Sequence, residues 1–175
     1  MTVGGNGGMI TTNDKKIAEM VKLLREHGGS NFAKYVGYNA RMNTMNAAFG
    51  RVQLRRLDEW NNRRRSLAKL YYEYLKDIHN IKLPIIDDRH VYHLFVIEAE
   101  NRDELREYLK SKEIMCGIHY PVAIHELKPY REYADRGYPN SEYHSKTCLS
   151  LPMYPTLKES DLKMVCDEIK RFYGG

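Results

Sequence analysis

Apolar residues recur every three or four positions in several stretches of the chain, and this spacing predicts amphipathic helices. The first helix follows Asn13 or Asp14, since either side chain can accept the free N–H groups of a helix start. It is expected to end over 27–30, where glycine supplies the left-handed conformation that stops a helix. The other helices are expected at about 43–78, 102–112 and 158–173.

The helical region at 43–78 carries two apolar stripes that differ in phase. The first stripe consists of Met45, Phe49 and Val52. The second consists of Leu57, Trp60, Leu67, Tyr71, Tyr74 and Ile78, and Arg64 interrupts it. Because one straight helix cannot bury both stripes on the same side, a bend is expected near Arg56 and Leu57.

Short runs of apolar and β-branched residues predict strands at 9–12, 93–99 and 114–118. Further extended segments are expected at 81–86 and 149–151. The proline-punctuated region between Pro121 and Pro139 is expected to be a loop with short helical pieces.

Strand and helix alternate over 81–175 for long enough to form a small C-terminal α/β domain. Residues 1–42 offer one strand, one helix and an irregular loop, which is too little for a layered core. We therefore predict an α/β chain of the α+β fragment type: the edge of a large domain at 1–42, long connecting helices at 43–80, and the small domain at 81–175.

Composition narrows the environment and the partners of the chain. None of its 175 residues belongs to an apolar run long enough to span a membrane, so no membrane partner is expected. Three cysteines without CxxC spacing favour reduced thiols and a cytoplasmic location. The formal net charge of +5 is compatible with anionic ligands without selecting them.

Arginine is concentrated in one part of the long helical region, which raises the possibility of nucleic-acid binding. The cluster comprises Arg51, Arg55, Arg56, Arg63, Arg64 and Arg65. Steps of about 100° per residue distribute these side chains around a helix, and Glu59 can pair with its neighbours. A solvated or inter-subunit face therefore fits better, and no nucleic-acid partner is expected.

Seven short segments, in order, resemble the motif series of the DegT/DnrJ/StrS family of fold-type I sugar aminotransferases. They are Gly4–Ile10, Arg25–Gly28, Gly37–Met42, Leu57–Asn61 with Arg63–Arg64, Val91–Val96, Gly117–Pro121 and Leu149–Pro155. The chain departs from the family pattern at Asn6 and at Asn43–Asn46, and it has about half the family's length.

The resemblance implies chemistry that uses pyridoxal phosphate (PLP). In the family, a lysine that holds PLP as a Schiff base stands two residues before the segment that matches Met1–Val3. We therefore expect no catalytic residue in this chain, no PLP bound to the chain alone and no activity of the chain alone. The resemblance gives Asn39 and Arg41 contacts to the PLP phosphate of a neighbouring subunit; without it, they would be a turn asparagine and a surface arginine.

The resemblance also places His119, Tyr120 and His125 in a loop that lines the sugar pocket. Histidine and tyrosine suit contacts to hydroxyl and phosphate groups. Cys116 with the two histidines would offer three zinc ligands, but no fourth ligand is evident, so no metal is expected.

The implied function is that of the C-terminal portion of a nucleotide-sugar aminotransferase of polysaccharide or amino-sugar biosynthesis. Its partners would be a second copy in a dimer and, in the complete enzyme, a nucleotide-sugar and an amino donor. The alternative is a non-catalytic interaction or dimerisation module derived from the same family.

Overall fold

The computed structural model describes residues 3–29 and 34–174. The chain forms two compact units, Met1–Asp58 (unit 1) and Glu59–Gly175 (unit 2). The three-part domain division expected from the sequence stays a prediction.

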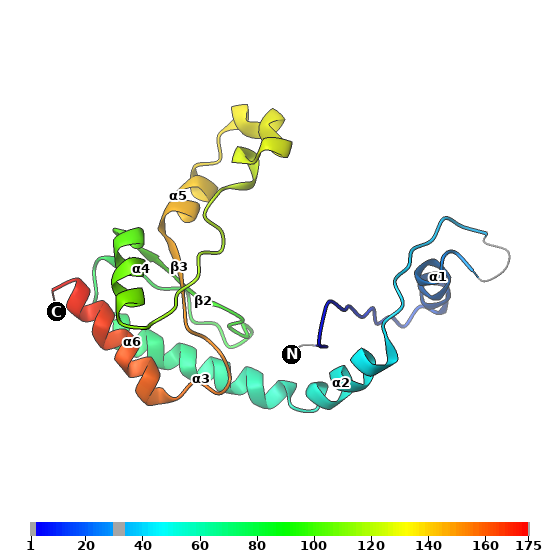
Figure 1. The fold of residues 1–175 in the computed structure, drawn as a ribbon, viewed down its shortest axis with the longest axis horizontal. Helices are drawn as coiled ribbons and strands as arrows, with labels where there is room; N and C mark the ends of the chain where they lie inside the picture. Colours follow the sequence, from blue (N-terminus) through cyan, green and yellow to red (C-terminus); the bar gives the residue numbers. More distant parts are fainter. Residues whose placement is uncertain (1–2, 30–33, 175) are drawn as a thin grey trace. The chain divides into compact units, whose positions relative to one another are not determined.

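Unit 1 contains the first two helices (Figure 1). Helix α1 spans Lys15–Arg25, and the carboxylate of Asp14 accepts hydrogen bonds from the N–H groups of Lys16 at 2.7 Å and Ile17 at 3.4 Å. The predicted capping by Asp14 is confirmed. Helix α2 spans Thr44–Leu54, and the side chain of Asn43 caps it at the N–H of Met45.

The prediction of a strand at 9–12 is wrong, because residues 9–12 form neither a strand nor a helix in the structure. A strand needs a neighbouring backbone to complete its hydrogen bonds, and no strand lies beside this segment within the described part of unit 1. Ser30, expected in the helix end, lies outside the described residues.

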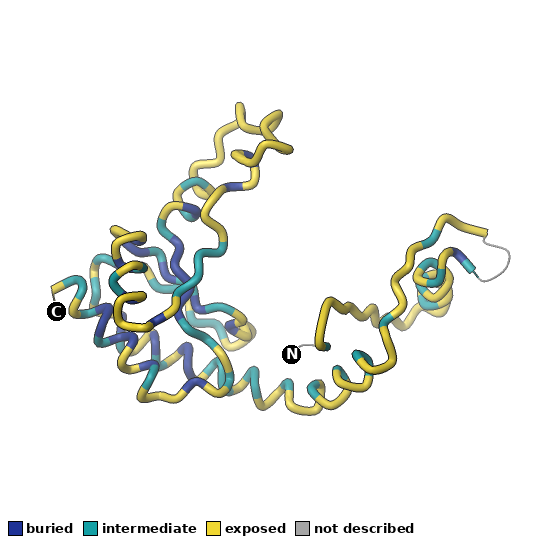
Figure 2. Tube along the Cα trace, in the orientation of Figure 1, coloured by how far each residue is buried: buried dark blue, intermediate teal, exposed yellow. Residues whose placement is uncertain are grey.

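The helices of unit 1 leave their apolar faces open. Neither α1 nor α2, whose residues are all described, contains a buried residue. Figure 2 shows these helices largely as exposed chain. Large apolar side chains of unit 1 that are at least half exposed include Met9, Ile17, Val36, Met45 and Val52.

The helical region is interrupted near Arg56, where the sequence predicts a bend, because α2 ends at Leu54 and helix α3 begins at Leu57. The bend itself stays a prediction. Helix α3 spans Leu57–Leu75 and buries one side of its C-terminal half in unit 2. Arg64, which interrupts the apolar stripe, donates from Nη1 to the backbone carbonyls of Tyr92, His93 and Met153 at 3.0–3.3 Å.

Unit 2 is built on an antiparallel sheet. In the described residues its strands are β1 (Ile81–Lys82), β2 (Phe95–Ala99) and β3 (Cys148–Leu151), in the order β1-β2-β3. The strand expected at 114–118 is wrong: only Gly117 forms a bridge, to Ser150. A strand needs consecutive pairs along a neighbouring backbone, and the other residues of 114–118 form none in the described structure.

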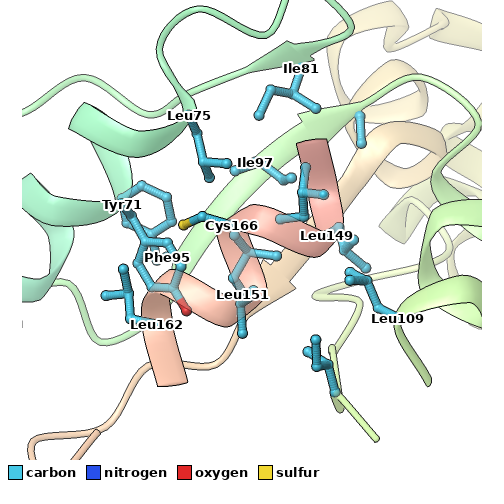
Figure 3. Packing of buried hydrophobic residues seen from close by; sticks show 14 of the residues in the cluster. Tyr71, Leu75, Ile81, Phe95, Ile97, Leu109, Leu149, Leu151, Leu162 and Cys166 are labelled. Atoms are coloured by element: carbon cyan, nitrogen blue, oxygen red, sulfur yellow. The ribbon is translucent and has the colours of Figure 1, made fainter. Parts of the chain in front are cut away.

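Helices α3, α4 (Arg102–Ser111) and α6 (Glu159–Phe172) complete the core of unit 2. Phe95 and Ile97 of β2 point toward Tyr71 and Leu75 of α3 and Cys166 of α6 (Figure 3). Tyr71 stacks on Phe95 with ring centroids 4.8 Å apart and donates its hydroxyl to the carbonyl of Pro152. The expected helices at 102–112 and 158–173 are confirmed.

The chain between α4 and β3 leaves the sheet and returns as an arm, defined here as residues 119–147 (Figure 1). It carries two 3₁₀ helices, η1 (Ile124–Glu126) and η2 (Lys128–Arg136), and helix α5 (Pro139–Thr147). The short helical pieces expected in this region are confirmed. Buried Arg102 anchors the arm, because its Nη1 donates to the carbonyls of Ser145 and Cys148.

Candidate functional site

A pocket of about 610 Å³ lies within the arm. Its lining includes His119, Tyr120 and His125, so the structure brings together the three residues that the sequence assigned to substrate binding. Their role stays a prediction. A volume of this size falls in the range of pockets that hold small organic ligands.

His119 is held at the base of the arm by the sheet. Its Nδ1 lies 2.8 Å from Oγ of Ser150 in β3. Gly117 lies so close that a Cβ atom there would come within 2.7 Å of the His119 ring. A larger residue at this position would therefore displace the imidazole from the pocket wall.

His125 is buried, with 8% of its surface exposed, and a carboxylate supports it. Nε2 of His125 lies 3.1 Å from Oε1 of Glu142 in α5. The same oxygen accepts the backbone N–H of Tyr138 at 3.0 Å. These bonds, the Tyr138 bond foremost, hold the pKa of the Glu142 carboxyl below its usual value.

Tyrosine rings and a further histidine complete the pocket, and the sequence analysis did not single them out. They are Tyr130 and Tyr133 of η2, Tyr138, and His144 of α5. The tyrosines of η2 are three residues apart, a spacing that places side chains on one side of a 3₁₀ helix. That spacing is the signal in the sequence that would have found them.

A second carboxylate lies next to a histidine of this pocket. Oε1 of Glu98 in β2 is 3.6 Å from Nδ1 of His144, and Lys82 of β1 lies 3.2 Å from Oε2. Oε2 is buried and has no hydrogen-bond partner in the described residues, although the lysine is near enough to form an ion pair. The carboxylate therefore links the sheet to α5.

Asn39 and Arg41, the expected phosphate contacts, lie in unit 1 on a segment held against the end of α1. His27 donates its N–H to the carbonyl of Tyr38, and Ala40 donates to Arg25. Gly28 makes this approach possible, since it has a φ of 82° and a Cβ there would clash with the carbonyl of Tyr35.

The two expected phosphate contacts differ in their present partners. Arg41 forms an exposed ion pair with Glu26 at 3.1 Å. Asn39 pairs with Glu26 through the backbone and is exposed. The amide of Asn39 is thus available for a ligand, whereas the guanidinium of Arg41 is shared with a carboxylate.

Cys116 and the arginines of α3 make contacts within the fold, and they form no metal site in the described residues. No group of three histidine, cysteine or acidic side chains suited to a metal occurs in the part of the chain that the structure describes. Burial raises the pKa of the Cys116 thiol to about 12. Arg63 pairs with Glu159 of α6 at 2.8 Å, and Arg65 donates to the carbonyl of His90.

Comparison with known proteins supplies the family. Residues 1–170 match the DegT/DnrJ/EryC1/StrS aminotransferase family. The chain belongs to that family.

Among the described residues, no helix has the length and apolar character needed to cross a bilayer.

One curated relative in the DegT/DnrJ/EryC1/StrS family is the dTDP-3-amino-3,6-dideoxy-alpha-D-galactopyranose transaminase of Aneurinibacillus thermoaerophilus. It is 35% identical over 170 residues, which are 95% of this chain and 47% of the relative. The chain spans about half the length of the curated relatives it matches. They include nucleotide-sugar aminotransferases, as the sequence resemblance implied.

Solved structures of family members agree with the fold. The structure of Streptomyces venezuelae DesV superposes with a TM-score of 0.89 at 34% identity, covering 94% of this chain and 46% of DesV. This confirms the predicted α+β fragment of a fold-type I aminotransferase. Bacillus subtilis NtdA, solved with the bound cofactor PMP, has a TM-score of 0.80, and the match covers 94% of this chain and 41% of the NtdA chain. Because the identity is only 21%, this likeness shows the fold alone.

Proposed function

We propose that the chain is the C-terminal portion of a nucleotide-sugar aminotransferase and that the arm pocket holds the sugar of the substrate. The observation that carries the proposal is the convergence of His119, Tyr120 and His125 on one pocket in a member of a sugar aminotransferase family. The relatives' names supply the substrate class, a keto-sugar linked to dTDP or UDP.

The pocket chemistry suits a polyhydroxylated ligand. Imidazole nitrogens and tyrosine hydroxyls donate to and accept from hydroxyl groups. Tyr130 and Tyr133 add ring surface on which the apolar face of a sugar can pack. In this proposal the chain's own residues bind and orient the sugar.

The cofactor of the complete enzyme would be PLP, which supplies an electron sink for amino-group transfer. The phosphate of PLP would be bound by the hydrogen-bond donors of Asn39 and Arg41, on the segment after α1. The exposed amide of Asn39 is free to donate, and the guanidinium of Arg41 can donate if the phosphate competes with Glu26. Among the described residues, none that lines the arm pocket is a lysine. We propose that the 175-residue chain alone binds no PLP and does not transaminate.

The open apolar faces of unit 1 support an assembly. Exposed apolar surface of this kind favours association with other protein. We propose a cytoplasmic homodimer, with residues 1–42 as part of the PLP-binding large domain, 43–80 as connecting helices and 81–175 as the small domain. The same faces would serve a non-catalytic interaction module, which remains the second candidate.

The sugar-binding proposal is tested by ligand titration of the 175-residue chain. We expect dTDP-glucose, used as a probe, to shift the NMR signals of residues in the arm, and His125→Ala to abolish these shifts. His79→Ala is the matched control, because His79 is exposed and lies outside the pocket. Signal changes confined to residues outside the arm, or changes that persist in His125→Ala, would contradict the assignment of the arm pocket to sugar binding.

A further inference from the structure

Glu142 joins two parts of the arm through a single carboxylate oxygen. Oε1 lies 3.1 Å from Nε2 of His125 in η1, and it accepts the backbone N–H of Tyr138, just before α5, at 3.0 Å. The rings of His125 and Tyr138 lie against each other with centroids 4.8 Å apart. The two walls of the pocket are therefore tied at one atom.

We infer that Glu142 is a positioning residue that holds His125 in the Nε2–H tautomer, so that Nδ1 is the acceptor His125 offers to a ligand hydroxyl. This inference rests on the proposed function for its ligand, a sugar. An ionised carboxylate can only accept hydrogen bonds, so the nitrogen facing it must carry the proton. Neutral imidazole carries one proton, which leaves Nδ1 with a lone pair.

The surroundings of His125 support this assignment. No described residue forms a hydrogen bond with its Nδ1, while the residue itself is buried and lines the pocket. The Tyr138 N–H, which also binds Oε1, favours the ionised form of Glu142. His119 differs, because its partner Ser150 has a hydroxyl that can either donate or accept and so fixes no tautomer.

Glu142 thereby decides that His125 offers the pocket a hydrogen-bond acceptor rather than a donor, a choice that the histidine alone would leave open. A lone-pair nitrogen accepts from a hydroxyl, whereas a ring N–H in the same place would seek a carbonyl or phosphate oxygen. His125 would therefore contribute to selection of a hydroxyl at the sugar position it faces.

Nitrogen-15 NMR of histidine-labelled chain tests the tautomer without any ligand. We expect the proton of His125 on Nε2, with its exchange slowed by the bond to Glu142. Glu142→Gln should preserve the signal, because the amide oxygen can accept both hydrogen bonds. Glu142→Ala should lose the signal through exchange with water. A proton on Nδ1 in the unaltered chain, or an Nε2 signal that Glu142→Ala leaves unchanged, would overturn the inference.

Glu126→Ala is the matched control within the same arm. Glu126 also accepts a backbone N–H, that of Ala123 at 3.1 Å, and although it follows His125 in the chain, its carboxylate forms no hydrogen bond with a pocket histidine among the described residues. The His125 signal should survive this change. Thermal unfolding of each variant separates a local change from loss of the fold, and the position of the proton in the unaltered chain decides the question if the alanine variant unfolds.

Titration with dTDP-glucose gives the second readout. We expect affinity to fall roughly tenfold in Glu142→Ala, the effect of one hydrogen bond, and to stay within about twofold in Glu142→Gln and Glu126→Ala. Equal affinity in the alanine variant would overturn the positioning role in binding. If the unaltered chain shows the expected tautomer and yet binds no probe, the proposed sugar site fails while the assignment of Glu142 stands.

Discussion

Replacing Arg64 by methionine should destabilise unit 2, because this side chain ties α3 to the segments that flank the sheet. Its Nη1 donates to the carbonyls of Tyr92, His93 and Met153 at 3.3, 3.1 and 3.0 Å. Nη1 carries two hydrogens, so the three contacts share them. Burial also lowers the pKa of the Arg64 guanidinium, which means that desolvation offsets part of the gain.

The expected loss follows from these contacts. Hydrogen bonds to a charged group contribute about 1.5–3 kcal/mol each, and an acceptor left without a partner costs about 1–3 kcal/mol. Since the hydrogens are shared and the desolvation cost disappears with the charge, we expect the free energy of unfolding to fall by about 2 kcal/mol in Arg64→Met.

Urea unfolding measures this loss, followed by circular dichroism and by the fluorescence of Trp60, the single tryptophan of the chain. The m-value should stay constant if only stability changes. Lys69→Met on the same helix is the control, because Lys69 forms an exposed pair with Asp88, and such pairs contribute about 0–1 kcal/mol. A loss below about 0.5 kcal/mol in Arg64→Met, or one equal to the control, would refute the reasoning.

Three other predictions concern the thiols, the arm and the open face of unit 1. Burial raises the pKa of the Cys166 thiol to about 12, so iodoacetamide at pH 8 should label Cys166 only after unfolding; mass spectrometry showing fast labelling of the folded chain would contradict this. Folding lowers the pKa of Glu142, so the ionised carboxylate stabilises the fold above pH 4.5, its usual pKa, and this stabilisation is lost as the pH falls through the lowered pKa. Melting temperatures of Glu142→Gln should therefore fall less between neutral and acid pH than those of the unaltered chain. An equal fall in both would contradict the role of the Glu142 carboxylate in acid stability. The chain should self-associate at about tens of micromolar, where modest interfaces form, and Phe49→Asp should weaken this association; a monomer by sedimentation in both forms would remove the argument from exposed apolar surface.

The helices could be predicted from the sequence because their signals are local. Asp14 caps α1, and the phase change between the two apolar stripes marks the break between α2 and α3. The strands at 9–12 and 114–118 were wrong because strand pairing depends on a partner elsewhere in the chain. The first segment has no paired neighbour in the described part of unit 1, and the second makes one bridge only.

The candidate site could be predicted in part, and the reason is similar. The resemblance to sugar aminotransferases pointed to His119, Tyr120 and His125, which the structure places in one pocket. The carboxylates beside the histidines were missed, because Glu142 is 17 residues from His125 and Glu98 lies on another element from His144. No periodicity connects such pairs, and only the tertiary fold brings them together.

The central claim is that this chain supplies the sugar-binding portion of a PLP-dependent aminotransferase. The direct measurement is transamination from glutamate to a dTDP-linked 3-keto sugar by the chain joined to the N-terminal half of the Aneurinibacillus thermoaerophilus relative, after the joined protein is shown to be folded and loaded with PLP. We expect product from the joined protein, less product with His125→Ala, weaker PLP retention with Asn39→Ala, and none from the 175 residues alone. Turnover by the 175-residue chain alone, or a folded and PLP-loaded joined protein that forms no product, would contradict the account.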